Sequence, residues 1–140
     1  MKNKLKIYTS ILVCFFFITK SVNANEPFTF NVTEIEILED GNQINGYNGG
    51  TATSEDGIVI FAKNFFYNKL TNILETSGNV KYLDKINNIV ITADKAIYFK
   101  NDEKIFTIGN SKVVNNINTI EANNLEYDKF KNIFEAKKNA

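Results

Sequence analysis

The sequence has 140 residues, of which 44% are hydrophobic, and its 16 lysines balance 16 acidic residues in the absence of arginine. This length suits one modest domain, and the lack of a basic excess argues against a nucleic-acid partner. Because the chain has no histidine and only one cysteine, Cys14, it cannot build imidazole base chemistry or a Cys/His metal site.

The first 24 residues have the three parts of a secretory signal peptide. Three lysines stand in the first six residues, an apolar core follows at residues 11–18, and residues 22–24 (VNA) form a small-residue cleavage site. An apolar run of this length is too short for a stable bilayer-spanning helix, which needs about 20 residues. We expect cleavage after Ala24, with an uncleaved N-terminal anchor as the alternative. The bulky valine before Cys14 argues against a lipid-attachment site.

Removal of residues 1–24 would change both the charge and the cysteine content of the chain. Four lysines and Cys14 leave with the signal, so 12 basic residues face 16 acidic ones and the net charge is −4. This charge again argues against nucleic acid as a partner. A processed domain of residues 25–140 has no disulfide, so its core and its hydrogen-bond ladders must hold it together.

Residues 25–57 are predicted to open the domain with strands. Residues 28–30 (FTF) and 34–37 (EIEI) alternate apolar with polar side chains, as half-buried strands do. A return strand is expected at residues 43–46, and residues 42–57 look like a weaker copy of the repeat that follows. The turn signals of this region are Asp40-Gly41, Gly49-Gly50 and Asp56-Gly57.

A repeat with a period near thirty residues occupies the rest of the chain. Its three copies span residues 58–80, 89–111 and 118–139, and they align without a gap when Tyr67, Tyr98 and Tyr127 share a column. Each copy is predicted to form a strand, a polar turn and a second strand. Changes of alternation near Asn64, Lys95 and Asn124 predict a bulge or bend in each copy. The dipeptides Gly78-Asn79 and Gly109-Asn110 are predicted to end the second strand in a tight turn.

The repeat predicts an all-β fold in which a sheet wraps on itself and leaves two open ends. Periodicity alone fits both a folded-over sheet and a β-solenoid. In the first two copies the faces opposite the presumed core are not uniformly polar, so either both sides of some strands are covered or one side meets a partner. These outward apolar residues are Val59, Phe61, Phe66, Val90, Ile97 and Ile108. The tyrosine column is expected to be packing with the hydroxyls satisfied at the rim, and a ligand groove is the alternative.

No motif for catalysis, metal or cofactor binding is found in the processed chain. The acidic residues are scattered through turns and outward strand positions, which indicates a solvated surface. A paired-carboxylate hydrolase is the minor alternative. No loop has the alternating oxygen ligands that calcium needs, and no glycine-rich phosphate loop is present.

The repeat motif resembles that of the OstA-like family. The family pattern is visible at residues 91–94 (ITAD) with Tyr98, at residues 120–122 (IEA) with Tyr127-Asp128, and at residues 78–80 (GNV). This family contains the lipopolysaccharide-transport proteins LptA and LptC and the N-terminal periplasmic domain of LptD. The third copy departs from the pattern, since Lys138-Asn139 replaces Gly-Asn. Two alternatives follow for the C-terminus: a partner completes the last strand, or the domain is incomplete there.

The resemblance implies a repetitive antiparallel β-jellyroll, folded over like a V, with open sheet edges. It implies a periplasmic, non-catalytic protein that carries the acyl chains of lipopolysaccharide inside the V. Its partners would be lipopolysaccharide and neighbouring jellyrolls of the bridge or of LptD, with head-to-tail self-association possible. An exported structural or adhesive module without lipid is the alternative. The predicted lipid-facing residues are Ile58, Ile60, Ala62, Phe65, Tyr67, Leu74, Val80, Ile89, Ile91, Ala93, Tyr98, Ile105, Ile120, Leu125, Tyr127 and Phe134.

Overall fold

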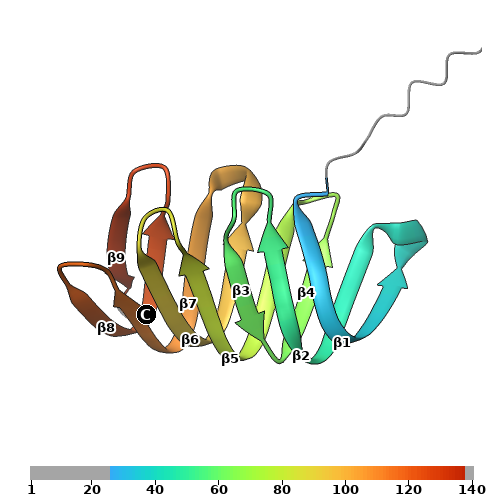
Figure 1. Cartoon of the computed structure of the whole chain (residues 1–140), viewed down its shortest axis with the longest axis horizontal. Coiled ribbons are helices and arrows are strands. Elements are labelled where there is room, and N and C mark those ends of the chain that lie inside the picture. The colour runs from blue at the N-terminus through green and yellow to red at the C-terminus, as the bar shows by residue number, and fades with distance from the viewer. Residues whose placement is uncertain (1–25, 138–140) are drawn as a thin grey trace, which may run out of the picture.

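The structure, a computed structural model, describes residues 26–137, and these residues form one antiparallel sheet of nine strands (Figure 1). The predicted signal peptide lies outside the described residues. Two short 3-10 turns, η1 (Glu39–Gly41) and η2 (Lys100–Asp102), connect strands. The strands are β1 (Phe28–Leu38), β2 (Gln43–Ser54), β3 (Val59–Ala62), β4 (Asn64–Asn68), β5 (Ile73–Asp84), β6 (Ile89–Phe99), β7 (Lys104–Val114), β8 (Thr119–Asp128) and β9 (Ile133–Lys137).

The sheet is a meander in which strands that are neighbours in sequence are also neighbours in space. Its order is β1-β2-β3-β5-β6-β7-β8-β9, and β4 pairs with the same two strands as β3. Only Lys63 separates β3 from β4, so the two act as one bent strand between β2 and β5. This all-antiparallel order confirms the predicted all-β jellyroll and excludes the β-solenoid.

A line of bends crosses the sheet and folds it into a V. The pairing register shifts between Thr92 and Lys95 of β6 and between Ile108 and Ser111 of β7, with further shifts in β1 and β5. The bends predicted near Asn64, Lys95 and Asn124 are therefore confirmed. We call residues 28–32, 50–62, 80–93 and 111–122 the first wing, and residues 34–47, 64–77, 95–108 and 124–137 the second wing. In Figure 1 the bends line the bottom and the turns of both wings reach the top.

The Gly-Asn dipeptides make the bends of β5 and β7, so the prediction that they end the strands was wrong. β5 runs through Gly78-Asn79 and β7 runs through Gly109-Asn110. Both residues of each pair have left-handed backbone, with φ of 82° and 51° at the first pair and 78° and 48° at the second. Two consecutive left-handed residues place an extra residue against the partner strand, and the strand changes direction without stopping.

The region expected to be a weaker repeat copy is a full strand. β2 has 12 residues, pairs with β1, β3 and β4, and buries Ile44 and Ala52. The predicted turn at Gly49-Gly50 is one of the bends within β2, whereas Asp40-Gly41 and Asp56-Gly57 do lie in turns between strands.

The inner faces of the two wings pack against each other through aromatic rings. Phe28 of the first wing contacts Tyr67 and Tyr98 of the second, with ring centroids 5.1 and 5.7 Å apart. Tyr82 of the first wing meets Tyr98 edge to face at 6.2 Å. The hydrophobic core therefore lies inside the V, where apolar side chains leave water on folding.

Candidate functional site

The candidate site is the apolar interior of the V. Fourteen of the sixteen predicted lipid-facing residues are buried, and all of these except Ala93 belong to the interior cluster. The other two, Ile120 and Phe134, are partly buried against the same cluster. Both exceptions lie on β8 and β9, where the interior opens at the C-terminal edge of the sheet. At the opposite edge, Ile35 and Ile37 of β1 are 51% and 61% exposed. Alternation thus predicted which side chains point inward, and the sheet ends explain why some stay accessible.

The interior rows run across the wings from strand to strand. In the second wing, the pairing aligns Ile37, Ile44, Tyr67, Leu74, Tyr98, Ile105, Tyr127 and Phe134 in one row. In the first wing, the row is Phe30, Ala52, Ile60, Tyr82, Ile91, Val113 and Ile120. The tyrosines of the predicted column are therefore separated by Leu74 and Ile105 instead of stacking.

Several buried interior residues were absent from the prediction. They are Phe28, Ile44, Ala52, Tyr82, Ala96 and Val113. Tyr82 and Val113 follow Gly78-Asn79 and Gly109-Asn110, which had been taken as strand ends, so the alternation was not extended to them. Continuing the period of two through Val80 would have identified Tyr82 as inward.

The hydroxyls of the tyrosine column are satisfied inside the protein, as the packing interpretation predicted. Each hydroxyl lies within hydrogen-bond distance of a residue five positions later that has left-handed backbone. The three distances are 2.8 Å for Tyr67 to Asn72, 2.6 Å for Tyr98 to Glu103 and 3.4 Å for Tyr127 to Asn132. Burial raises the pKa of Tyr67 and of Tyr127 to about 12, helped by nearby carboxylates, so both hydroxyls stay protonated.

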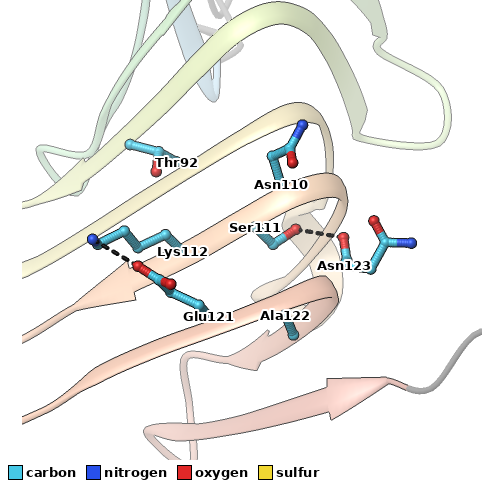
Figure 2. Close-up of a pocket in the computed structure, with 7 residues that line it drawn as sticks. All are labelled: Thr92, Asn110, Ser111, Lys112, Glu121, Ala122 and Asn123. Carbon is cyan, nitrogen blue, oxygen red and sulfur yellow. Dashed lines mark hydrogen bonds and ion pairs between the residues drawn. The ribbon is translucent and has the colours of Figure 1, made fainter.

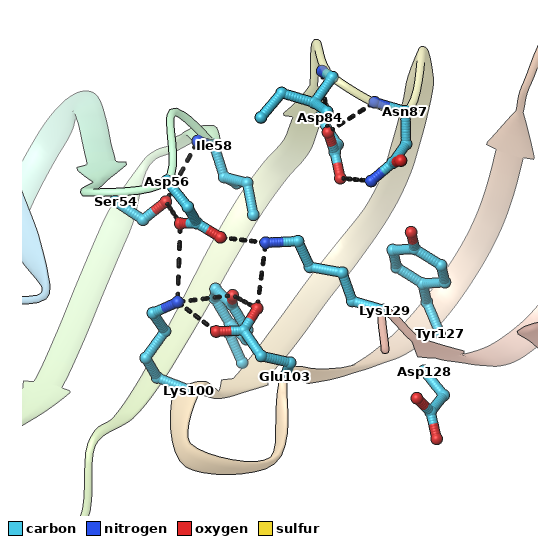
Figure 3. Close-up of polar contacts among 12 residues, drawn as sticks. Ser54, Asp56, Ile58, Asp84, Asn87, Lys100, Glu103, Tyr127, Asp128 and Lys129 are labelled. Atoms are coloured by element: carbon cyan, nitrogen blue, oxygen red, sulfur yellow. Dashed lines mark hydrogen bonds and ion pairs between the residues drawn. The ribbon is translucent and has the colours of Figure 1, made fainter. Parts of the chain in front are cut away.

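Four charged residues, here called the clasp, join the tips of the two wings (Figure 3). Asp56 comes from the turn between β2 and β3 in the first wing, while Lys100, Glu103 and Lys129 come from turns of the second. Lys100 Nζ lies 3.6 Å from Asp56 Oδ1, and Lys129 Nζ lies 3.1 Å from Glu103 Oε2. Lys129 also pairs with Asp56, and Lys100 pairs with Glu103. The clasp thus closes the V on the side opposite the bends.

The clasp residues are partly shielded from water, which strengthens their mutual attraction. The side chains of both lysines are 18% exposed, and that of Glu103 is 12% exposed. Burial by itself would raise the pKa of Asp56, but bonds from Lys129 and Ser54 and the charge of Lys100 lower it to about 2. Burial would likewise lower the pKa of Lys129, but its bonds to Asp56 and Glu103 raise it overall.

No sequence pattern predicted the clasp, because its members are far apart in the chain. One signal could have pointed to it. The position five residues after the column tyrosine holds Asn72 in the first copy and Asn132 in the third, but Glu103 in the second. A charged residue in a column of asparagines indicates a partner of opposite charge, which here is supplied by Lys100 and Lys129.

The outer faces carry the apolar residues that the alternation placed there. Phe61, Phe66 and Ile108 are 41%, 39% and 45% exposed. On the second wing a shallow groove of about 350 Å³ includes Phe99 and Phe106, whose ring centroids are 5.4 Å apart. The described residues of the chain do not fully cover these side chains. Of the two alternatives for the outer faces, covered strands or contact with a partner, the structure therefore leaves the second open.

A second hollow lies beside the bends near the C-terminal edge and is polar (Figure 2). Its volume is about 540 Å³, and the residues around it include Thr92, Asn110 and Lys112. Lys112 pairs with Glu121 at 2.8 Å and, by donating to it, lowers the pKa of that carboxyl. Because these two charges neutralise each other, the hollow offers no net charge to a ligand.

Residues 26–137 contain no group of three acidic, histidine or cysteine side chains that could hold a metal ion. Within the same residues, no helix has the length and apolar character needed to cross a membrane.

Solved structures that resemble the chain include one that superposes on most of it. It is the crystal structure of LptH from Pseudomonas aeruginosa, which matches with a TM-score of 0.71 and covers 79% of this chain and 82% of LptH. The chain has the fold of LptH. LptH is described as the LptA-homologous periplasmic component of the conserved lipopolysaccharide transport device. The two sequences are 16% identical, so the likeness to LptH concerns the fold. No protein-family model and no curated protein sequence matches the chain.

Proposed function

We propose that the chain is a periplasmic component of lipopolysaccharide transport, of the LptA type within the OstA-like family, and that it has no catalytic activity. The observation that carries this proposal is the V-shaped sheet with an apolar interior and two open ends, a fold that it has in common with LptH. LptC or the N-terminal domain of LptD would use the same fold. We prefer LptA because LptH is LptA-homologous.

In this proposal the acyl chains of lipopolysaccharide lie along the interior rows. As the lipid moves from strand to strand, its acyl chains would leave one aliphatic side chain and contact the next, for example among Ile60, Ile91 and Leu74. The residues that are still accessible at the ends, Ile37 on β1 and Phe134 on β9, would be the first and last contacts. Apolar burial of this kind is worth about 0.8 kcal/mol for each methylene group removed from water.

Lipid entry requires the wings to separate, because interior side chains fill the V in the structure. Tyr67, Leu74 and Tyr98 are each 2% exposed or less. The clasp opposes separation, since parting the tips would break the pairs of Asp56 with Lys100 and Lys129. We therefore infer that the clasp holds the empty protein closed and that bound lipid holds it open.

The edges of the sheet would join neighbouring jellyrolls. Within residues 26–137, β1 and β9 each pair on one side only, so each presents a row of free backbone groups to a partner strand. If β1 of a second copy added beside β9, the sheet would stay antiparallel and Ile37 of that copy would continue the interior row past Phe134. The apolar interior would then run unbroken from one molecule into the next.

The export signal predicted for residues 1–24, which lie outside the described part of the chain, would agree with a periplasmic site of action. The absence of cysteine after residue 24 means that the folded domain needs no disulfide.

Photocrosslinking tests the proposal in cells. A photoreactive amino acid at Ile91, which is 2% exposed in the interior, should form adducts with lipopolysaccharide. The matched control is Lys81, an exposed outward residue of the neighbouring strand β5. Adducts at Ile91 and none at Lys81 support the proposal. Absence of adducts from Ile91, Tyr98 and Phe134 alike would refute it.

The filled interior favours one alternative, an exported structural or adhesive module with a solid core. In that case the buried residues serve stability alone, and the wings never part. The same crosslinking experiment separates the two functions, because a solid core gives no lipid adduct from any inward position.

A further inference from the structure

One interior hydroxyl differs from all the others. Tyr82 on β5 is 2% exposed, and its hydroxyl oxygen has no hydrogen-bond partner among residues 26–137. The hydroxyls of Tyr67, Tyr98 and Tyr127 all have partners five residues later in the chain. A position at the rim of the V does not explain the missing partner of the Tyr82 hydroxyl, because Tyr82 lies in the middle of the first wing.

Packing does not require this hydroxyl. The interior row places Tyr82 between Ile60 and Ile91, and its ring meets Tyr98 edge to face. A phenylalanine would make the same ring contacts without burying a polar atom. Since a buried hydroxyl without a partner destabilises the empty fold, its presence indicates a partner that the empty protein lacks.

The surroundings of Tyr82 define the chemistry of that partner. Burial, then the charge of Asp84, and further nearby groups that include Asp56 raise the pKa of Tyr82, so the hydroxyl stays protonated and can donate. The same carboxylates disfavour an anion such as a phosphate at this place. The aliphatic neighbours Ile60 and Ile91 suit hydrocarbon. The partner is therefore a neutral acceptor attached to apolar chains.

We propose that the Tyr82 hydroxyl is a ligand-binding group that donates a hydrogen bond to the carbonyl oxygen of an acyl ester or amide in an amphiphile. This proposal rests on the proposed function, because it assumes that an acylated lipid enters the interior. Tyr82 then fixes how deep the lipid lies. The acyl linkage sits at Tyr82, and the hydrocarbon follows the rows toward the open ends.

The position of Tyr82 also relates the linkage to the clasp. Tyr82 touches Tyr98, and the Tyr98 hydroxyl lies 2.6 Å from Glu103 Oε2. A carbonyl at Tyr82 is thus one side chain away from the charged residues that close the V. The acyl chains remain in the apolar interior, and the polar part of the lipid lies toward the parted tips of the wings.

Lipid A is the probe that tests the inference, with the full chain titrated against it and the dissociation constant measured. Tyr82→Phe should raise that constant about fivefold, the effect of losing one net hydrogen bond. Tyr47→Phe is the matched control, because it removes a hydroxyl bonded on the outer face and should leave lipid A binding unchanged. Tyr82→Phe should also unfold at the same urea concentration as the wild type or at a higher one.

A spectroscopic measurement identifies the acceptor. The ester and amide carbonyls of lipid A, labelled with carbon-13, absorb in the infrared at a frequency that falls when they accept a hydrogen bond. The band of bound lipid A should lie lower in the wild type than in Tyr82→Phe.

Three results would overturn the inference. A dissociation constant of Tyr82→Phe for lipid A within twofold of the wild-type value would show that the Tyr82 hydroxyl does not contact the ligand. An unchanged carbonyl band would show that an acyl carbonyl is not the acceptor. A lower urea midpoint for Tyr82→Phe would mean that the hydroxyl has a structural partner. Each of these leaves the proposed function intact when the wild type binds lipid A. A wild type that does not bind lipid A refutes both.

Discussion

The clasp leads to a quantitative prediction for Asp56→Asn. This change keeps the shape of the side chain but removes the charge that pairs with Lys100 and Lys129. The pKa of Asp56 falls from 3.8 to about 2 on folding. At 1.36 kcal/mol for each pKa unit, this shift sets an upper limit of about 2.5 kcal/mol on the stabilisation. Because the Asp56 side chain is 32% exposed, solvent screening reduces the expected loss to about 1 kcal/mol.

The pH dependence of the same variant follows from the direction of the shift. A carboxyl whose pKa is lower in the folded state stabilises the fold above its unfolded pKa, here 3.8, and loses that effect as the pH falls toward 2. The stability difference between wild type and Asp56→Asn should therefore be full at pH 7, shrink below pH 4 and vanish only below pH 2.

Urea unfolding followed by far-ultraviolet circular dichroism measures this difference, since the chain has no tryptophan. Asp102→Asn is the matched control, because it removes the same charge from an exposed residue of η2 next to the clasp. The reasoning fails if Asp56→Asn and Asp102→Asn have equal stability at pH 7. It also fails if the loss caused by Asp56→Asn is the same at pH 3 as at pH 7.

Two further predictions concern the bends and the edges. At Gly78, φ is +82° and an added Cβ would lie 2.6 Å from Lys63 Cβ, so Gly78→Ala should cost about 3 kcal/mol in urea unfolding. Gly57→Ala, at φ +84° with nothing within 4 Å, should cost only about 1 kcal/mol, and equal losses would contradict a clash at the bend. If copies join through β1, Ile37→Asp should keep the protein monomeric in light scattering at concentrations where the wild type gains mass. Leu38→Asp, on the outer face of the same strand, should associate like the wild type, and assembly by Ile37→Asp would exclude this edge.

The period of thirty residues was enough to predict the strands and the inward face, whereas it left the folded-over sheet and the β-solenoid as alternatives that the antiparallel pairing decides. It worked because each copy is local, with strands joined by short turns and side chains that alternate in and out. The Gly-Asn dipeptides misled the prediction, since left-handed residues serve turns and bulges equally well. The consequence was specific: strands stopped too early, and Tyr82 was left out of the interior.

The clasp could not be predicted, for a different reason. Asp56 and Lys129 are 73 residues apart and meet only because the V folds over and brings the wing tips together. Nothing in the local sequence around either residue encodes that meeting. Contacts across the interior, such as that between Tyr82 and Tyr98, depend on the same folding step.

The meander has a consequence for how such a molecule can change its length. Each repeat of about thirty residues adds two strands, and adjacent strands lie about 4.8 Å apart. Duplication of one repeat would therefore lengthen the apolar interior of the V by roughly 10 Å. The cross-section stays the same, because the bends and the inward alternation are repeated within every copy. A gap of different width can thus be bridged by changing the number of repeats, without redesigning the inner lining or the two terminal strands.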